Sequence, residues 1–192
     1  MTNINIPPGL FDENVELFSY EGTAMALHNG QAVKLFDLPA KFLKKIEKHL
    51  NQNEPAERAL ELAGYSSPEA KLNKYVVCRF GHFDSSPDFK NGELVDSEFV
   101  DCGYRGKCPM EGVVCGSVWI NKRIVSTFEI QLIKLLAKED TIPVIAEKLG
   151  ISINTLETRK KILFEKLGVL SRPRMVSKCY DIGILKPVGC LN

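Results

Sequence analysis

The chain has 192 residues, 44% of them hydrophobic and 26% charged, and its formal net charge at pH 7 is +1. These values are ordinary for a globular protein and exclude a chain that is disordered throughout. No apolar run is long enough to span a bilayer, and the first residues lack the basic and apolar regions of a signal peptide. We therefore expect a cytoplasmic protein with no membrane partner, whose six cysteines are reduced thiols or metal ligands.

The N-terminal half predicts a small mixed α+β domain over residues 1–120. Short apolar runs separated by turn residues predict an antiparallel sheet, with strands at residues 15–20, 24–27 and 32–36. Apolar periodicity and Pro and Gly boundaries then predict three helices, at residues 40–50, at residues 55–63 and from Pro68 onward.

The segment 78–116 has no helical period and is rich in glycine. Such a stretch buries little apolar surface, so something other than a core must order it. Zinc prefers four tetrahedral thiolate or imidazole ligands, and turn residues let a backbone wrap around the ion. We therefore expect a structural zinc site, with His82 able to replace one thiolate. The expected ligands are Cys78, Cys102, Cys108 and Cys115.

Three alternatives for these cysteines stay open. An iron–sulfur cluster also takes four cysteine ligands, and wide spacings suit a redox-sensing cluster. Reversible disulfides would likewise make a redox sensor. Four reduced and buried cysteines could also act as small hydrophobic side chains. The other two, Cys179 and Cys190, are interpreted as a packing residue and an incidental one.

The net charge is unevenly distributed along the chain. Residues 126–192 carry eleven Lys and Arg against seven Asp and Glu, a net charge of +4. The first 125 residues carry fourteen against seventeen, a net charge of −3. A polyanionic partner is therefore expected to meet the C-terminal part, although a difference of this size alone does not identify one.

A helical pattern is predicted to resume at Val118, with residues 121–123 as the junction to an all-α domain over residues 121–192. Four helices are expected there. Thr127 and Thr141 can cap the first two, and Ser152 or Asn154 the third, which Gly168 ends. The last three are expected at residues 142–149, 155–167 and 172–182. Two helices joined by a short turn, the second with a basic outer face, make a helix-turn-helix that can enter the DNA major groove.

The residues of this domain also resemble the LuxR-type (GerE-like) helix-turn-helix family, over about sixty positions without a gap. The resemblance implies a four-helix DNA-binding module that dimerises through its fourth helix, around Met175, Cys179 and Ile182. Four positions depart from the family's usual residues: Leu156 stands for a Val, Glu157 for a Lys, Arg159 for a His and Phe128 for an Arg. The matching positions are Glu129, Ile145, Ala146, Leu149, Ile151, Ser152, Thr155, Lys166, Leu167, Gly168, Val169, Ser171, Arg172, Gly183, Ile184 and Leu185.

The outer face of the third helix predicts the DNA contacts. Glu157, Thr158 and Lys161 are expected to reach base edges, since Lys can donate to guanine and Glu can accept from cytosine N4. Phosphate contacts set register without reading sequence. They are expected from Thr155, Arg159 and Lys160 and, on the flanking backbone, from Arg172 and Arg174.

Two of these assignments have a purely structural alternative. Glu157 lies three residues after Asn154 and could complete a capping box. Lys160 and Lys161 could be a solvated face.

Together these features predict a sequence-specific transcription regulator rather than an enzyme. Its expected partners are double-stranded DNA, a second copy of the chain and RNA polymerase, with the N-terminal half sensing a signal or holding a partner. The alternative is a zinc-stabilised protein-interaction adaptor with weak DNA binding.

Overall fold

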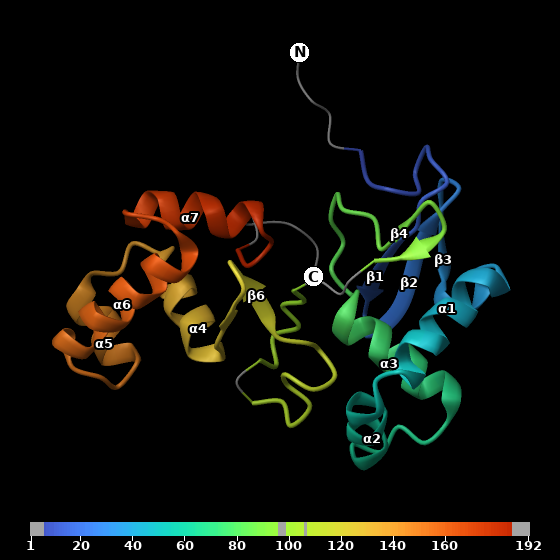
Figure 1. The fold of residues 1–192 in the computed structure, drawn as a ribbon, viewed down its shortest axis with the longest axis horizontal. Helices are drawn as coiled ribbons and strands as arrows, with labels where there is room; N and C mark the ends of the chain where they lie inside the picture. The colour runs from blue at the N-terminus through green and yellow to red at the C-terminus, as the bar shows by residue number, and fades with distance from the viewer. Residues whose placement is uncertain (1–5, 96–98, 106, 186–192) are drawn as a thin grey trace. The chain divides into compact units, whose positions relative to one another are not determined.

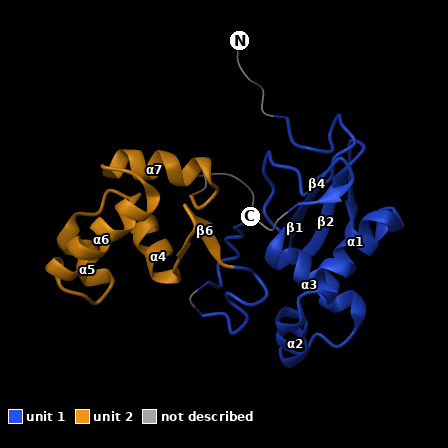
Figure 2. Ribbon diagram, viewed as in Figure 1, with its two compact units in different colours: residues 1–116, 192 blue, residues 117–191 orange. Residues whose placement is uncertain are grey.

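The computed structural model describes residues 6–95, 99–105 and 107–185, and it has mixed α and β structure, as the sequence predicts (Figure 1). The chain divides into two compact units, residues 1–116 and residues 117–191 (Figure 2). The predicted boundary at 120/121 differs from this division by four residues. The first strand of unit 2, β6 (Val118–Ile120), pairs with the strand that follows it, so these residues fold with the C-terminal part.

Unit 1 begins with the predicted antiparallel sheet. Its strands are β1 (Glu16–Tyr20), β2 (Thr23–His28) and β3 (Gln31–Lys34), in the order β1-β2-β3. Glu21-Gly22 and Asn29-Gly30 make the two connections, and all four residues have positive φ values between 49° and 77°. Two-residue turns with positive φ suit the right-handed twist of a hairpin, which explains why these dipeptides define the strands.

Three helices follow the sheet, and their caps lie where the sequence predicts helix starts. Asn53 accepts a hydrogen bond from Ala56 N, and Ser67 accepts one from Ala70 N. A short 3-10 turn, Leu35–Asp37, leads into the first helix. The helices are α1 (Ala40–Asn51), α2 (Glu54–Leu62) and α3 (Pro68–Arg79).

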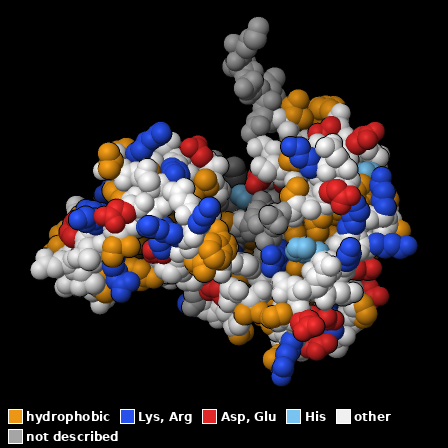
Figure 3. All heavy atoms as spheres, in the orientation of Figure 1, with side chains coloured by type: hydrophobic (Ala, Val, Ile, Leu, Met, Phe, Trp, Pro, Cys, Tyr) orange, Lys and Arg blue, Asp and Glu red, His pale blue; other side chains and the backbone are white. Residues whose placement is uncertain are grey.

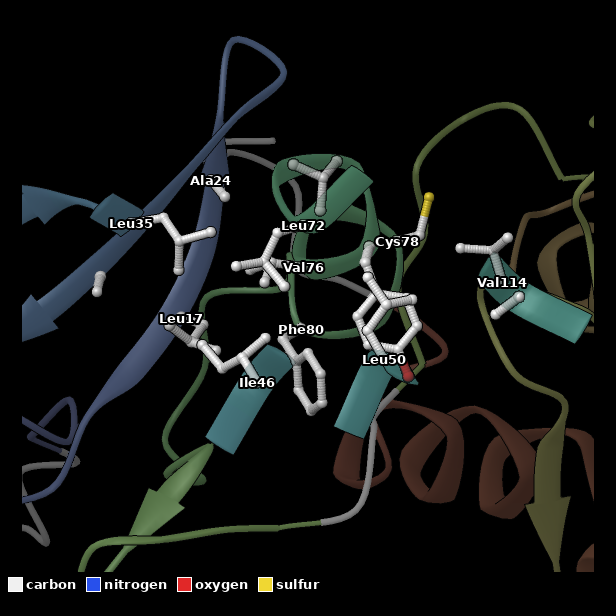
Figure 4. Packing of buried hydrophobic residues seen from close by; sticks show 14 of the residues in the cluster. Leu17, Ala24, Leu35, Ile46, Leu50, Leu72, Val76, Cys78, Phe80 and Val114 are labelled. Carbon is white, nitrogen blue, oxygen red and sulfur yellow. The ribbon is translucent and has the colours of Figure 1, made fainter. Parts of the chain in front are cut away.

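The core of unit 1 forms where α1 and α3 cover the sheet. Figure 4 shows Leu72 and Val76 of α3 turned toward Leu17 and Ala24 of the strands, with Ile46 of α1 beside them. All of these side chains are at most 3% exposed. Burying one such aliphatic side chain contributes about 1.5–3 kcal/mol, so this layer fixes how the helices lie on the sheet.

Residues 80–116 contain a hairpin that the sequence analysis did not predict. It pairs β4 (Phe89–Lys90) with β5 (Glu93–Leu94), and Val15 and Phe89 exchange backbone hydrogen bonds of 3.2 and 3.0 Å. The expected lack of helix in this segment is confirmed for its described residues beyond the end of α3.

Two carboxyl groups are buried beside this hairpin. Asp88 Oδ2 accepts a 2.7 Å hydrogen bond from Leu17 N, and Glu16 Oε1 accepts a 2.8 Å bond from Asp84 N. The side chains are 3% and 0% exposed respectively. Burial raises the pKa of Asp88 well above its usual value, and the nearby Glu16 carboxyl raises it further.

Unit 2 begins with a hairpin instead of the predicted helix, so the predictions of helix from Val118 and of an all-α domain are wrong. Strand β6 pairs with β7 (Arg123–Val125) through a turn at Asn121 and Lys122, whose φ values are 50° and 61°. The predicted junction at residues 121–123 is therefore mostly a hairpin turn. The two-residue turn decides the outcome, because it brings the short apolar runs on either side into register.

Four helices make up the rest of the described part of unit 2. They are α4 (Thr127–Leu136), α5 (Ile142–Lys148), α6 (Ile153–Leu167) and α7 (Arg172–Asp181). Their bounds lie within two residues of those predicted for the last three. Within the described ranges, no helix is both long and apolar enough to cross a membrane.

Replacing Asp88 with Asn should stabilise unit 1 at neutral pH by about 1–2 kcal/mol. Asn Oδ1 can accept the same bond from Leu17 N without placing a charge in a buried site. Because folding raises the pKa of Asp88, this residue contributes to the free energy of unfolding at low pH. That contribution is lost as pH rises through the folded-state pKa. Urea unfolding across this range should therefore show a steeper loss of stability for the wild type than for Asp88→Asn.

The matched control is Asp88→Leu, which removes the acceptor of the Leu17 amide and should destabilise unit 1 at every pH. Equal pH dependence in wild type and Asp88→Asn would contradict the assignment.

Candidate nucleic-acid interface

Helix α4 is fixed at its start by a capping box. Ser126 N donates to Glu129 Oε2 over 2.7 Å, and Glu129 N donates to Ser126 Oγ over 3.3 Å. The expectation that Thr127 caps this helix is wrong, since Ser126 is the cap and Thr127 is the first helical residue. The pair satisfies two backbone amides that have no partner within the helix.

Lys166 of α6 completes this arrangement. Its ammonium lies 2.6 Å from Glu129 Oε1 and donates to the Ile124 carbonyl over 2.7 Å. Both charged side chains are only 13–14% exposed. Burial opposes ionisation of Glu129, but hydrogen bonds from Lys166 and Ser126 outweigh it and lower the pKa of this carboxyl. One ion pair therefore connects α6, the start of α4 and strand β7.

A short turn connects α5 to α6. Gly150, at φ 63°, ends α5 in the left-handed conformation, and Ile151 N donates to the Ala146 carbonyl over 3.1 Å. Ser152 is the cap of α6 and accepts from Thr155 N over 3.1 Å. The predicted inward residues Leu156, Leu163 and Leu167 are all fully buried. The outer face of α6 is thereby held in one orientation by its apolar side.

The predicted contact residues lie on that outer face, and five of the six are exposed. Lys160 is the exception, because it is half-buried and its ammonium pairs with the Glu157 carboxylate at 2.7–2.8 Å. The capping-box alternative for Glu157 is therefore wrong: the helix is capped at Ser152, and Glu157 holds Lys160. The exposed members of the set are Thr155, Glu157, Thr158, Arg159 and Lys161.

The other side chains of this face differ in how firmly they are held. The Thr158 hydroxyl donates to the Asn154 carbonyl over 3.0 Å, and the Arg159 guanidinium lies 4.4 Å from the centre of the Phe128 ring. Lys161 makes no ion pair within the described ranges. Figure 3 shows Lys and Arg side chains interspersed with Asp and Glu on the visible face of unit 2.

Arg172, predicted to hold the DNA backbone, is engaged within unit 2. Its guanidinium donates to the carbonyls of Leu136, Lys138 and Asp140, which lie at the end of α4 and in the connection to α5. This side chain therefore joins the start of α7 to that connection. Arg174 is exposed, and its backbone amide is capped by Ser171 Oγ at 3.4 Å.

A groove of about 740 Å³ runs beside the outer face of α6. Its lining includes Glu157 and Lys161 of α6, Ile142 of α5 and residues 169–172. Of these, Leu170 is fully exposed.

Two residues of α7 that were expected at a dimer contact lie in the core instead. Met175 and Cys179 are fully buried within unit 2, whereas Tyr180 and Ile182 remain about 40% exposed. A dimer through α7 would have to use its exposed residues, among them Tyr180. Burial raises the pKa of the Cys179 thiol to about 11, as expected for a packing residue.

The four predicted metal ligands lie in one part of unit 1. Cys78 and Cys115 are buried and belong to its core, Cys108 packs against that core, and Cys102 is half-buried. Burial raises the pKa of Cys78 to about 11. The Lys74 ammonium opposes this shift, and the other three thiols are near enough to reinforce it.

No three His, Cys, Asp or Glu side chains in the described ranges are grouped to ligate one ion. His82, the alternative ligand, lies 3.7 Å from Asp84 Oδ2.

No protein-family model, curated protein or solved structure matches this chain.

Replacing Lys166 with Met should destabilise unit 2 by about 2–4 kcal/mol, because it leaves the mostly buried Glu129 carboxylate without its cation. Hydrogen exchange of the α6 amides would report this locally and independently of unit 1. Lys138→Met, at an exposed lysine after α4, is the matched control and should change protection little. Equal protection in the two variants would show that the pair does not hold α6.

Proposed function

We propose that this chain is a sequence-specific DNA-binding transcription regulator that inserts α6 into the major groove. The observation that carries the proposal is the outer face of α6, where polar and basic side chains and Ile162 are exposed. A buried leucine side and a capped start fix its orientation. A helix presented in this way is about the width that a major groove admits.

The charge of this face suits a polyanion. Between Thr155 and Lys161 it carries three cations and one carboxylate, a net charge of +2. Lys161 is the strongest candidate for a direct contact, because its ammonium is exposed and makes no ion pair in the described part of the chain. Arg159 and Thr155 are positioned nearer the helix start, where phosphate contacts set the register.

The Glu157–Lys160 pair gives the face a feature that a plain basic helix lacks. In the free protein the carboxylate and the ammonium satisfy each other at the surface. On DNA, Glu157 can accept from cytosine N4 while Lys160 turns to a phosphate. Each side chain of the pair then has a partner on the DNA in place of the other. An exposed pair of this kind contributes less than about 1 kcal/mol, so the exchange costs little.

Resemblance to the LuxR-type family supports the same function and adds a homodimer. A single small module buries little DNA surface, so a second copy would supply the area that tight specific binding requires. The exposed Tyr180 of α7 and Ile182 just after it are the residues we assign to that contact. Unit 1 would then sense a signal or hold a partner such as RNA polymerase.

Lys161→Ala should weaken DNA binding several-fold and reduce the slope of log K against log salt concentration by about 1. Lys160→Ala should weaken binding as well, because on DNA that ammonium turns from Glu157 to a phosphate. Fluorescence anisotropy with a DNA site selected from random sequence would measure both. The matched control is Lys44→Ala, which removes the same charge from the exposed side of α1 in unit 1. Equal affinity of Lys161→Ala and Lys44→Ala would exclude α6 as the contact face.

Glu157→Gln should change base preference at one position of the selected site and leave the other positions unaltered. It should also raise affinity for unrelated DNA, since it removes a negative charge and frees Lys160. Selection from random DNA with both proteins tests the first effect, and a salt titration on unselected DNA tests the second. An unaltered base preference would show that Glu157 contacts no base and serves only to pair with Lys160.

A further inference from the structure

The C-terminal stretch of unit 1, residues 99–116, carries three of the four clustered cysteines and has no regular structure among its described residues. Five of its side chains are nevertheless buried: Phe99, Val100, Met110, Val114 and Cys115. A chain segment without helix or strand needs another source of order, because each fixed residue costs about 1–2 kcal/mol of backbone entropy. Burial of five side chains offsets only part of the backbone entropy that is lost when eighteen residues are ordered.

The segment is held to itself and to α3 by two arginines. Arg105 is 8% exposed, donates to the Val100 carbonyl over 2.9 Å, and lies 4.5 Å from the centre of the Phe99 ring. Arg79, at the end of α3, donates to the Val114 carbonyl over 3.4 Å. Figure 4 shows Cys78 on the side of α3 that faces Val114, away from the sheet. The thiol of α3 is therefore presented to the segment that carries the other three.

Lys74 lies one helical turn before Cys78 on the same face of α3, and its charge interacts with Cys78, Cys102 and Cys108. Arg105 has an acidic neighbour, Glu111, at 3.9 Å. Lys74 therefore supplies a positive charge beside the thiols. A zinc ion with four thiolates carries a net charge of −2, part of which the Lys74 ammonium would offset.

We propose that Cys78, Cys102, Cys108 and Cys115 bind one structural zinc ion that fastens the segment 99–116 to α3. The proposal rests on the gathering of four thiols, drawn from a helix and an irregular segment, beside the Lys74 ammonium. Because no three of these side chains are grouped for ligation, zinc binding would draw residues 102–115 closer to Cys78. Metal binding would therefore be coupled to ordering of the segment, as in small zinc domains.

Disulfides explain these observations less well. Two of them could use all four thiols, but Cys78 and Cys115 are buried, which limits the access of oxidants to them. Reduced thiols acting only as core residues would not require the neighbouring Lys74 ammonium. The zinc proposal does not depend on DNA binding by unit 2.

The test is elemental analysis of the full chain, purified without oxygen from cells supplied with both zinc and iron. We expect about one zinc ion per chain, lost in Cys108→Ser and Cys115→Ser. The matched control, Cys179→Ser, changes a buried cysteine of unit 2 and should keep the metal. Absence of metal from the wild type, or full zinc content in the two serine variants, would overturn the site. Iron with visible absorption would overturn zinc as its occupant.

A second measurement applies if the serine variants do not fold. Trypsin can cut after Arg105 and after the exposed Lys107, both inside the segment. Wild-type protein stripped with a chelator should be cut there quickly, and addition of zinc should slow the cleavage at least tenfold. Cleavage at the same rate with and without zinc would contradict the proposal. DNA affinity measured on the same samples reports separately on unit 2.

Discussion

The ammonium group of Lys166 joins three elements of unit 2. It pairs with Glu129, which also caps α4, and donates to the carbonyl of Ile124 in β7. A mostly buried ion pair stabilises only when its geometry is good and its remaining donors are used, and both conditions hold here. The orientation of α6, and with it every side chain on its outer face, depends on this pair together with the buried leucines.

With α6 held in this way, its outer side chains divide into engaged and available groups. Lys160 and Glu157 hold each other, Arg159 lies over Phe128, and Lys161 has its ammonium in solvent. A second arginine that looks equally suited to phosphate, Arg172, instead joins the start of α7 to backbone carbonyls near α5. The number of Lys and Arg residues in the sequence therefore exceeds the number of cationic groups that are available to bind a ligand.

Unit 1 combines an aliphatic core with two buried carboxyl groups and a group of cysteines. The sheet and helices bury aliphatic side chains, while Glu16 and Asp88 are carboxyl groups in the same buried setting. Such groups make a domain sensitive to pH, because burial favours the neutral form. The cysteines occupy the region where regular structure ends, so the least ordered part of the unit has the densest set of potential ligands.

The sequence by itself determined the local structure of this protein. Turns that contain glycine define the bounds of the three strands, and Ser, Asn and Gly define most helix ends. These residues set backbone conformation or bind backbone groups only a few positions away. The hairpin β6–β7 was not predicted, because two strands of three residues are too short to show a clear alternation of apolar and polar residues. The partner of Lys166, the engagement of Arg172 and the gathering of Cys78 with Cys115 were decided only by the tertiary structure. Each joins residues more than 30 positions apart, and no local pattern specifies which distant group a side chain meets.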